Sequence, residues 1–250
     1  MNSLDKMLSI LDLFDGDAAV ITLDEVERAT GASRSSAYRY LQSLADAGLI
    51  AQASSGGYAL GARILELDRL HRNSDRLLAA ARPVMDAVSS RIGFNMILSR
   101  YYRDRVICSH TAWPDTSLTA IYERGRPLPL FFGAMAKVIL ANLSPYQLRN
   151  LMLKHVDEIR SAGLGGDWKE FRTAMARLRK QRSCVTRAEI TPESVGVAAP
   201  ILDLDDRVIG SIAFAVPRAA FEILSEDGIR EEIIATAEKI MRNMRDDASA

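Results

Sequence analysis

A pair of short helices is predicted on either side of Gly31, and this pair most constrains what the chain can fold into. Thr22 and Glu25 have the spacing of a capping box, so the first helix is predicted to begin there and to run towards Ala29. Gly31 then breaks it, because glycine readily adopts the left-handed backbone that ends a helix. Two helices joined by a tight turn are typical of a helix-turn-helix.

The second helix carries the groups that could read DNA. Ser33 is a suitable N-cap and Gly48 is placed to end the helix. Between them, apolar residues recur at three- and four-residue spacing and form one buried face: Ala37, Tyr40, Leu41 and Leu44. Guanidinium and hydroxyl groups lie largely off this face, where a recognition helix contacts base edges and phosphates. The candidate DNA-binding residues here are Ser33, Arg34, Ser35, Ser36, Tyr38 and Arg39.

A hairpin is predicted directly after this helix. Two short apolar runs, Leu49–Gln52 and Tyr58–Leu60, flank a turn of two serines and two glycines. Such a two-stranded hairpin would form the wing of a winged helix, with Ser54 and Ser55 as further candidate DNA contacts. Small helical pairs with polar faces are common outside DNA-binding proteins. The wing favours double-stranded operator DNA as the partner.

The overall charge gives no general attraction to DNA. The chain has 250 residues, with 32 basic and 32 acidic side chains. Residues 1–72 carry seven basic against ten acidic groups, whereas residues 30–63 carry three arginines against Asp46 alone. A small positive surface on a neutral protein predicts modest non-specific affinity and reliance on two half-sites. We therefore expect a homodimer, or a dimer of dimers.

Other partners and cofactors are not indicated. No apolar run approaches the roughly 20 residues that a membrane span needs, and the N-terminus lacks a secretory pattern, which predicts a cytoplasmic protein without a membrane partner. The two cysteines, Cys108 and Cys184, have neither disulfide-framework nor metal-ligand spacing. We expect buried, reduced thiols, no metal and no cofactor.

A further helix is predicted at the N-terminus, before the helix-turn-helix, and its apolar stripe is larger than a small winged domain needs. The stripe comprises Leu4, Met7, Leu8, Leu11 and Phe14. It can serve the domain core, a contact with a second subunit, or both.

A linker helix is expected after the wing. The predicted organisation is a winged helix-turn-helix DNA-binding domain at 1–61, a linker helix at 62–74 and an effector-binding and oligomerisation domain at 75–250. The boundary is placed near Asn73–Asp75, where polarity is highest. Helical periodicity continues to Ile92, and Pro83 is expected to kink or restart that helix.

The remaining pattern alternates between strands and helices, which predicts an α+β domain with an antiparallel sheet. Strands are predicted at Phe94–Arg100, Val106–Thr111, Leu118–Glu123, Val195–Leu202 and Val208–Val216. Helices are predicted at Leu130–Leu143, Pro145–Lys154, Trp168–Gln181 and Gly228–Arg245.

Three segments together resemble the IclR family of bacterial transcriptional regulators, over nearly the whole chain. They are the winged helix of Ser33–Ile50 with Tyr58–Gly61, the segment Gly125–Ala141, and Thr186–Glu189 with Gly196–Ile201. The resemblance implies a GAF-like effector domain and control of catabolic genes. Phe131 stands where the family usually has His, and Ala136 where it usually has Gly, which would make the pocket entrance bulkier and more apolar.

The resemblance also implies an effector pocket between the sheet and the helix that starts near Gly133. Backbone N–H groups at Gly133, Ala134 and Met135 could hold a carboxylate, so a small aromatic or other organic acid is the expected effector. Arg187 and Glu189 would close or orient the site, or face solvent, or pair with each other. Apolar walls are expected from Met96, Phe132 and the strand that begins at Val195. Gly196 on that strand is a further candidate. Small residues at alternating strand positions would leave room or simply pack the core: Ala198, Ser211, Ala213 and Ala215.

Two other classes of function were weighed against this one. Cys108 and His110 could share a strand face, but a thiol–imidazole pair also needs an orienting group and a pocket, so the chain is not expected to be an enzyme. A small-molecule sensor or interaction module without specific DNA binding is the alternative, because the N-terminal region is acidic. Arg34 and Arg39 on one helix favour DNA binding.

Overall fold

The computed structural model describes residues 2–15, 18–118 and 121–249. The chain divides into two compact units, Met1–Asp75 and Arg76–Ala250, and each is described by itself. No helix within the described residues is long and apolar enough to cross a lipid bilayer.

The N-terminal unit contains the predicted helix-turn-helix. Thr22 and Glu25 form a reciprocal capping box at the start of α2, and Gly31 ends that helix with φ of 59°. The side chain of Ser33 caps α3 by accepting a hydrogen bond from the backbone N–H of Ser36. The elements of this unit are α1 (Ser3–Ser9), a 3-10 helix (Ile10–Leu13), β1 (Val20–Ile21), α2 (Leu23–Thr30), α3 (Arg34–Asp46), β2 (Ile50–Gln52), β3 (Tyr58–Leu60) and α4 (Arg63–Ser74).

The wing has one strand more than the sequence predicted. β2 and β3 form the expected hairpin, and β1 pairs with β3 on its other side, with Val20 opposite Ala59. A strand of two residues is too short to show a two-residue hydrophobic period, so pattern reasoning missed it. The N-terminal apolar stripe is divided: Met7, Leu11 and Phe14 pack against the core of this unit, whereas Leu4 and Leu8 are 66% and 55% exposed.

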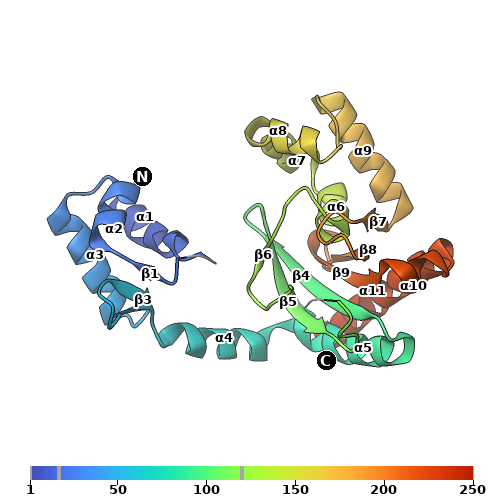
Figure 1. Cartoon of the computed structure of the whole chain (residues 1–250), viewed down its shortest axis with the longest axis horizontal. Helices are drawn as coiled ribbons and strands as arrows, with labels where there is room; N and C mark the ends of the chain where they lie inside the picture. The colour runs from blue at the N-terminus through green and yellow to red at the C-terminus, as the bar shows by residue number, and fades with distance from the viewer. Residues whose placement is uncertain (1, 16–17, 119–120, 250) are drawn as a thin grey trace. The chain divides into compact units, whose positions relative to one another are not determined.

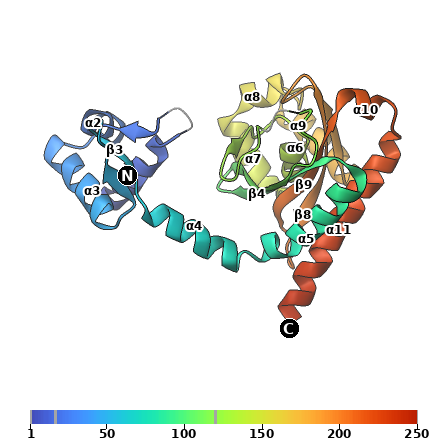
Figure 2. The ribbon, with the colours of Figure 1, turned by 60° about the horizontal axis from the view of Figure 1, so that its bottom comes forward.

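The C-terminal unit is built on an antiparallel sheet with the strand order β6-β5-β4-β9-β8-β7. Figures 1 and 2 show α5 and α11 beside each other against this sheet. The strands are β4 (Asn95–Tyr102), β5 (Arg105–Ala112), β6 (Pro127–Leu128), β7 (Cys184–Arg187), β8 (Ser194–Leu202) and β9 (Val208–Pro217). The helices are α5 (Arg76–Ile92), α6 (Ala134–Asn142), α7 (Pro145–Lys154), α8 (Val156–Ser161), α9 (Trp168–Gln181), α10 (Arg218–Glu222) and α11 (Glu226–Ser249).

Side-chain alternation divides the sheet into two faces. On β4, Met96 and Leu98 belong to the core formed with α5 and α11, whereas Ile97 packs with α6. On β9, Phe214 belongs to the α11 core and Ala213 to the α6 core. Because successive strand residues point to opposite faces, the position of each residue along its strand decides which core it joins.

Several predicted boundaries are wrong. Leu118 and residues 121–123 are not in a strand, and positions 119–120 of that predicted strand lie outside the described residues. The strand beside β5 is instead β6, which begins at Pro127 after a turn at Gly125. α6 begins four residues later than predicted, because Gly133 has φ of 82°, a conformation that interrupts a helix. The short elements β7, α8 and α10 were not predicted.

The helix break between the linker and α5 lies at Asp75 and not at Pro83. Asp75 has an extended backbone, with φ of −77° and ψ of 96°, and α5 then runs through Pro83 to Ile92. The other helix predictions for this unit are confirmed, including α7, α9 and α11.

Gly210 allows the closest approach of backbone within the sheet, and its replacement by Ala is expected to destabilise the C-terminal unit. An added Cβ would lie 2.1 Å from the carbonyl oxygen of Ser99 on β4, so the neighbouring strand would have to move. We expect a loss of about 1–3 kcal/mol in the free energy of unfolding, measured by denaturant titration. Gly228→Ala is the matched control, because its Cβ would meet only the Ser225 side chain at ordinary contact distance. Equal stability of the two variants would contradict the argument.

Candidate functional site

The first turns of α3 present the predicted DNA-contact residues on an accessible surface. Ser33, Arg34, Ser35, Tyr38 and Arg39 are exposed, with Tyr38 at 52%. Their side chains are linked by hydrogen bonds. Ser33 Oγ is 3.3 Å from Ser35 Oγ and donates to Ser36 Oγ at 3.1 Å, and Arg39 Nη2 donates to Ser36 Oγ at 3.3 Å. Ser36 is half-buried. Ser54 and Ser55 are exposed at the tip of the wing.

Arg34 differs from Arg39 in its partners. Its Nη1 donates to Asp24 Oδ1 at 2.7 Å and to Glu27 Oε2 at 2.9 Å, and both carboxylates lie on α2. The hydrogen bond to Asp24 and the charge of Glu27 raise the pKa of Arg34, so the guanidinium stays protonated. Among the described residues, α3 therefore carries one arginine, Arg34, held by two carboxylates and one, Arg39, hydrogen-bonded to a hydroxyl.

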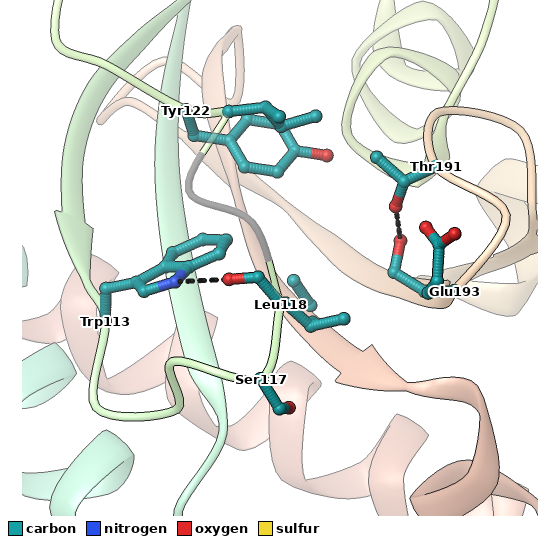
Figure 3. A pocket seen from close by; sticks show the side chains of 9 residues that line it. Trp113, Ser117, Leu118, Tyr122, Thr191 and Glu193 are labelled. Atoms are coloured by element: carbon teal, nitrogen blue, oxygen red, sulfur yellow. Dashed lines mark hydrogen bonds between the residues drawn. The ribbon is translucent and has the colours of Figure 1, made fainter.

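A cavity of about 260 Å³ lies in the C-terminal unit between the segment after β5 and the start of β8. Figure 3 shows Trp113 and Tyr122 on one side of it and Thr191 and Glu193 on the other. The two aromatic rings are 5.8 Å apart and tilted by 46°. Its lining residues are Trp113, Ser117, Leu118, Ile121, Tyr122, Thr191, Glu193, Ser194 and Ala215.

The cavity adjoins a smaller one, of about 30 Å³, at the start of α6. The two share Tyr122, Ser194 and Ala215 as lining residues. At this end the carboxylate of Glu189 accepts a hydrogen bond from the backbone N–H of Gly133 at 2.8 Å. Its other oxygen accepts from Lys137 Nζ at 2.5 Å. The N-terminus of α6 thus holds a carboxylate, which is the chain's own Glu189.

Six of the residues predicted for the effector site line the smaller cavity: Gly133, Ala134, Met135, Glu189, Gly196 and Ala213. Glu189 neither faces solvent alone nor pairs with Arg187. It comes from the loop after β7, and its position is set by the helix N-terminus and the buried lysine, both of which favour an anion.

The structure places the other predicted residues elsewhere. Met96 and Val195 lie on the α11 face of the sheet, because strand alternation turns them away from α6. Phe132 packs with the core under α7 and α9, as does Phe131, which is buried there and does not form a pocket entrance. Arg187 pairs with Glu226 at 2.5 Å and lies over the Phe221 ring.

Two small residues pack the core and leave no space. Ala198 is buried among the residues that contact α6, and the hydroxyl of Ser211 is 2.7 Å from that of Ser99 on the neighbouring strand. Their size lets α6 and adjacent strands approach closely.

Sequence reasoning missed the aromatic wall and the buried lysine. Trp113 and Tyr122 lie in an irregular segment, part of which was predicted to be a strand. An irregular segment has no regular repeat of apolar residues, so no pattern indicated that these two side chains line a cavity. Lys137 carried a usable signal, because a lone lysine within an apolar helical segment must find a buried partner. Its side chain is only 10% exposed.

Cys108 and His110 do not share a strand face. Leu98 pairs with His110 and Ser99 pairs with Cys108, so a bulge at Ser109 interrupts the alternation. Cys108 joins the α6 core, and burial raises the pKa of its thiol to about 11. Both cysteines are free and buried, as the sequence predicted. The thiol–imidazole arrangement considered from the sequence is therefore wrong.

Both halves of the chain match the same protein family. Residues 3–54 match the IclR helix-turn-helix domain, and residues 71–242 match the C-terminal domain of bacterial transcriptional regulators of the IclR type. The chain belongs to the IclR family of DNA-binding transcriptional regulators. The resemblance read from the sequence is confirmed.

The relatives of this IclR-family chain are regulators of distant sequence. The DNA-binding transcriptional repressor YiaJ of Escherichia coli is 21% identical, with 99% of this chain and 91% of that protein covered. The Pca regulon regulatory protein of Pseudomonas putida is 22% identical, with 85% and 73% covered. A solved IclR homologue from Microbacterium hydrocarbonoxydans in complex with 4-hydroxybenzoate has a TM-score of 0.74 at 20% identity, with 98% and 99% covered.

The Lys137–Glu189 pair yields a stability prediction. Glu189→Gln leaves the lysine charge buried without its counter-charge, so we expect a loss of about 2–4 kcal/mol in the free energy of unfolding, measured in urea. The double variant Lys137→Met, Glu189→Gln removes both charges and should recover much of this loss.

Arg187→Gln is the matched control for this pair. It breaks an exposed ion pair at the neighbouring strand end and should cost less than about 1 kcal/mol. A double variant as unstable as Glu189→Gln alone would contradict the argument from charge.

Proposed function

We propose that this IclR-family protein is a ligand-responsive regulator of catabolic genes whose effector is a small aromatic or other organic acid. The observation that carries the proposal is the aromatic-lined cavity of about 260 Å³, which leads to the carboxylate position at the start of α6. The proposal assigns DNA binding to 1–61, a linker role to 62–74, and effector binding and oligomerisation to 75–250. It includes no catalytic step.

The shape and lining of the cavity support an aromatic effector. Trp113 and Tyr122 offer faces on which a ring can pack, and Leu118 and Ala215 add apolar surface. The homologue solved with 4-hydroxybenzoate supports the same chemical class by analogy.

The position of Lys137 supports an acid over a neutral ligand at the inner end of the cavity. Its charge is nearly buried and needs an anion beside it. An effector carboxylate could take the place of Glu189, since one anion would replace another. Glu189 comes from a loop and its side chain is 27% exposed, so it could move into water without leaving an unpaired buried charge.

The proposed response requires coupling between effector and operator. A homodimer, or a dimer of dimers, would present two winged helices to two half-sites, and effector binding would bias their spacing or orientation. Such coupling is reciprocal: an acid that weakens operator binding must itself bind more weakly to the operator complex.

The proposal is tested by mobility shift at fixed salt. The full-length protein is mixed with its own upstream intergenic DNA, with and without a panel of aromatic and aliphatic acids and their amides. We expect specific DNA binding that an acid changes and the matching amide does not. Specific binding that no acid alters would contradict the effector assignment, and a response to the amide alone would contradict the acid class.

Filling the cavity should remove the response without removing DNA binding. Ala215 lines both cavities, and Ala215→Leu would add three carbons to that space. We expect unchanged operator affinity without acid. The acid concentration needed for a half-maximal change in operator binding should rise at least about tenfold, because the ligand would clash with the added side chain. Ala176→Leu, on the exposed side of α9, is the control. An unchanged response in Ala215→Leu would place the effector elsewhere.

A further inference from the structure

Arg34 is the first residue of α3, where a recognition helix meets base edges. It is 66% exposed, yet two carboxylates from α2 bind the same nitrogen, Nη1. Asp24 is 72% exposed and Glu27 is 25% exposed, so Glu27 is the more confined of the two partners. The guanidinium is thereby anchored on one side.

The two acids bind only one of the three nitrogens of the Arg34 guanidinium, so the N–H donors on the other two do not contact these acids. A guanidinium carries N–H groups on Nε, Nη1 and Nη2, and both ion pairs of Arg34 use Nη1. The edge formed by Nε and Nη2 keeps two parallel N–H donors. This fork matches the two acceptors, N7 and O6, that guanine presents in the major groove.

The charges of the cluster argue against a phosphate contact. Arg34 contributes one positive charge, while Asp24 and Glu27 contribute two negative ones, so the three side chains together repel a phosphate. Directional hydrogen bonds to a guanine edge survive this loss of net charge better than a general attraction to the DNA backbone. Arg39 offers the contrast within the same helix, because its hydrogen-bond partner among the described residues is the neutral hydroxyl of Ser36.

We propose that Arg34, held at Nη1 by Asp24 and Glu27, reads a guanine in each operator half-site, and that Arg39 contacts phosphate. Asp24 and Glu27 act as positioning residues: they orient the guanidinium and suppress its binding to DNA of any sequence. The acidic first helix of the motif thus lowers non-specific affinity and raises discrimination. The inference rests on the DNA-binding function and is independent of the effector.

The first experiment selects binding sites from random duplex DNA with the full-length wild type, Arg34→Ala and Arg39→Ala. Arg34→Ala should lose the preference for guanine at one position of each half-site, with discrimination there reduced about 5- to 100-fold. Its affinity should keep the wild-type dependence on salt. Arg39→Ala should weaken binding to all sequences alike and reduce the salt slope by about one.

The second experiment tests the carboxylates with the double variant Asp24→Asn, Glu27→Gln. It should bind random DNA several-fold more tightly than wild type and discriminate less at the guanine position. The same double change in the Arg34→Ala background should have a smaller effect on discrimination, because the residue through which the acids act is gone. Thermal unfolding of every variant checks that the fold is kept.

Three results would overturn the inference. A reduced salt slope with unchanged base preference in Arg34→Ala would mean that Arg34 contacts phosphate and does not read a base. An equal change in discrimination with and without Arg34 would mean that Asp24 and Glu27 act only by repelling DNA. A wild type that selects no sequence would overturn both this inference and the regulator proposal, whereas the first two results leave the regulator proposal intact.

Discussion

Alternation of side chains across β4, β9 and β8 is the constraint on which the C-terminal unit depends. Each strand is covered on both faces, by α6 on one side and by α5 and α11 on the other, so every residue joins one core or the other. Small residues face α6: an added Cβ at Gly196 would lie 3.5 Å from Ala134 Cβ. This close approach places the N-terminus of α6 at the smaller cavity, which Gly133, Ala134 and Met135 line. The bulge at Ser109 interrupts this alternation. One extra residue on β5 turns His110 and Cys108, two positions apart, to opposite faces of the sheet.

Each unit contains a cation held by carboxylates, and burial makes the two arrangements physically different. Lys137 is nearly buried, so its charge must keep an anionic partner and the pair contributes to the stability of the fold. Arg34 is exposed, so its ion pairs contribute little to stability, and their consequence is for the direction and net charge of the recognition surface. The same chemical pairing therefore has different consequences in the two units, because one cation is nearly buried and the other is exposed.

Local signals in the sequence predicted much of the N-terminal unit. The Thr22–Glu25 capping box, the Ser33 cap and the left-handed glycine at Gly31 depend on residues close together in the chain, and each is present as predicted. β1 could not be predicted in this way, since two residues have no measurable period and its pairing partner lies far along the chain. In the C-terminal unit, the segment from Leu118 to Glu123 combined apolar and β-branched residues and so predicted a strand. Of its described residues, Leu118, Ile121 and Tyr122 line a cavity and do not extend the sheet.

The helix-turn-helix, the α+β class and the antiparallel sheet could all be predicted from the amino-acid sequence. These follow from caps, glycines and hydrophobic periods, all of which act over a few residues. Three arrangements could be seen only in the folded chain: Glu189 occupies the N-terminus of α6 beside Lys137, Met96 and Val195 face the opposite core, and two acids of α2 hold Arg34. Such contacts join residues distant in sequence, and strand register and helix packing, which no local pattern specifies, bring them together.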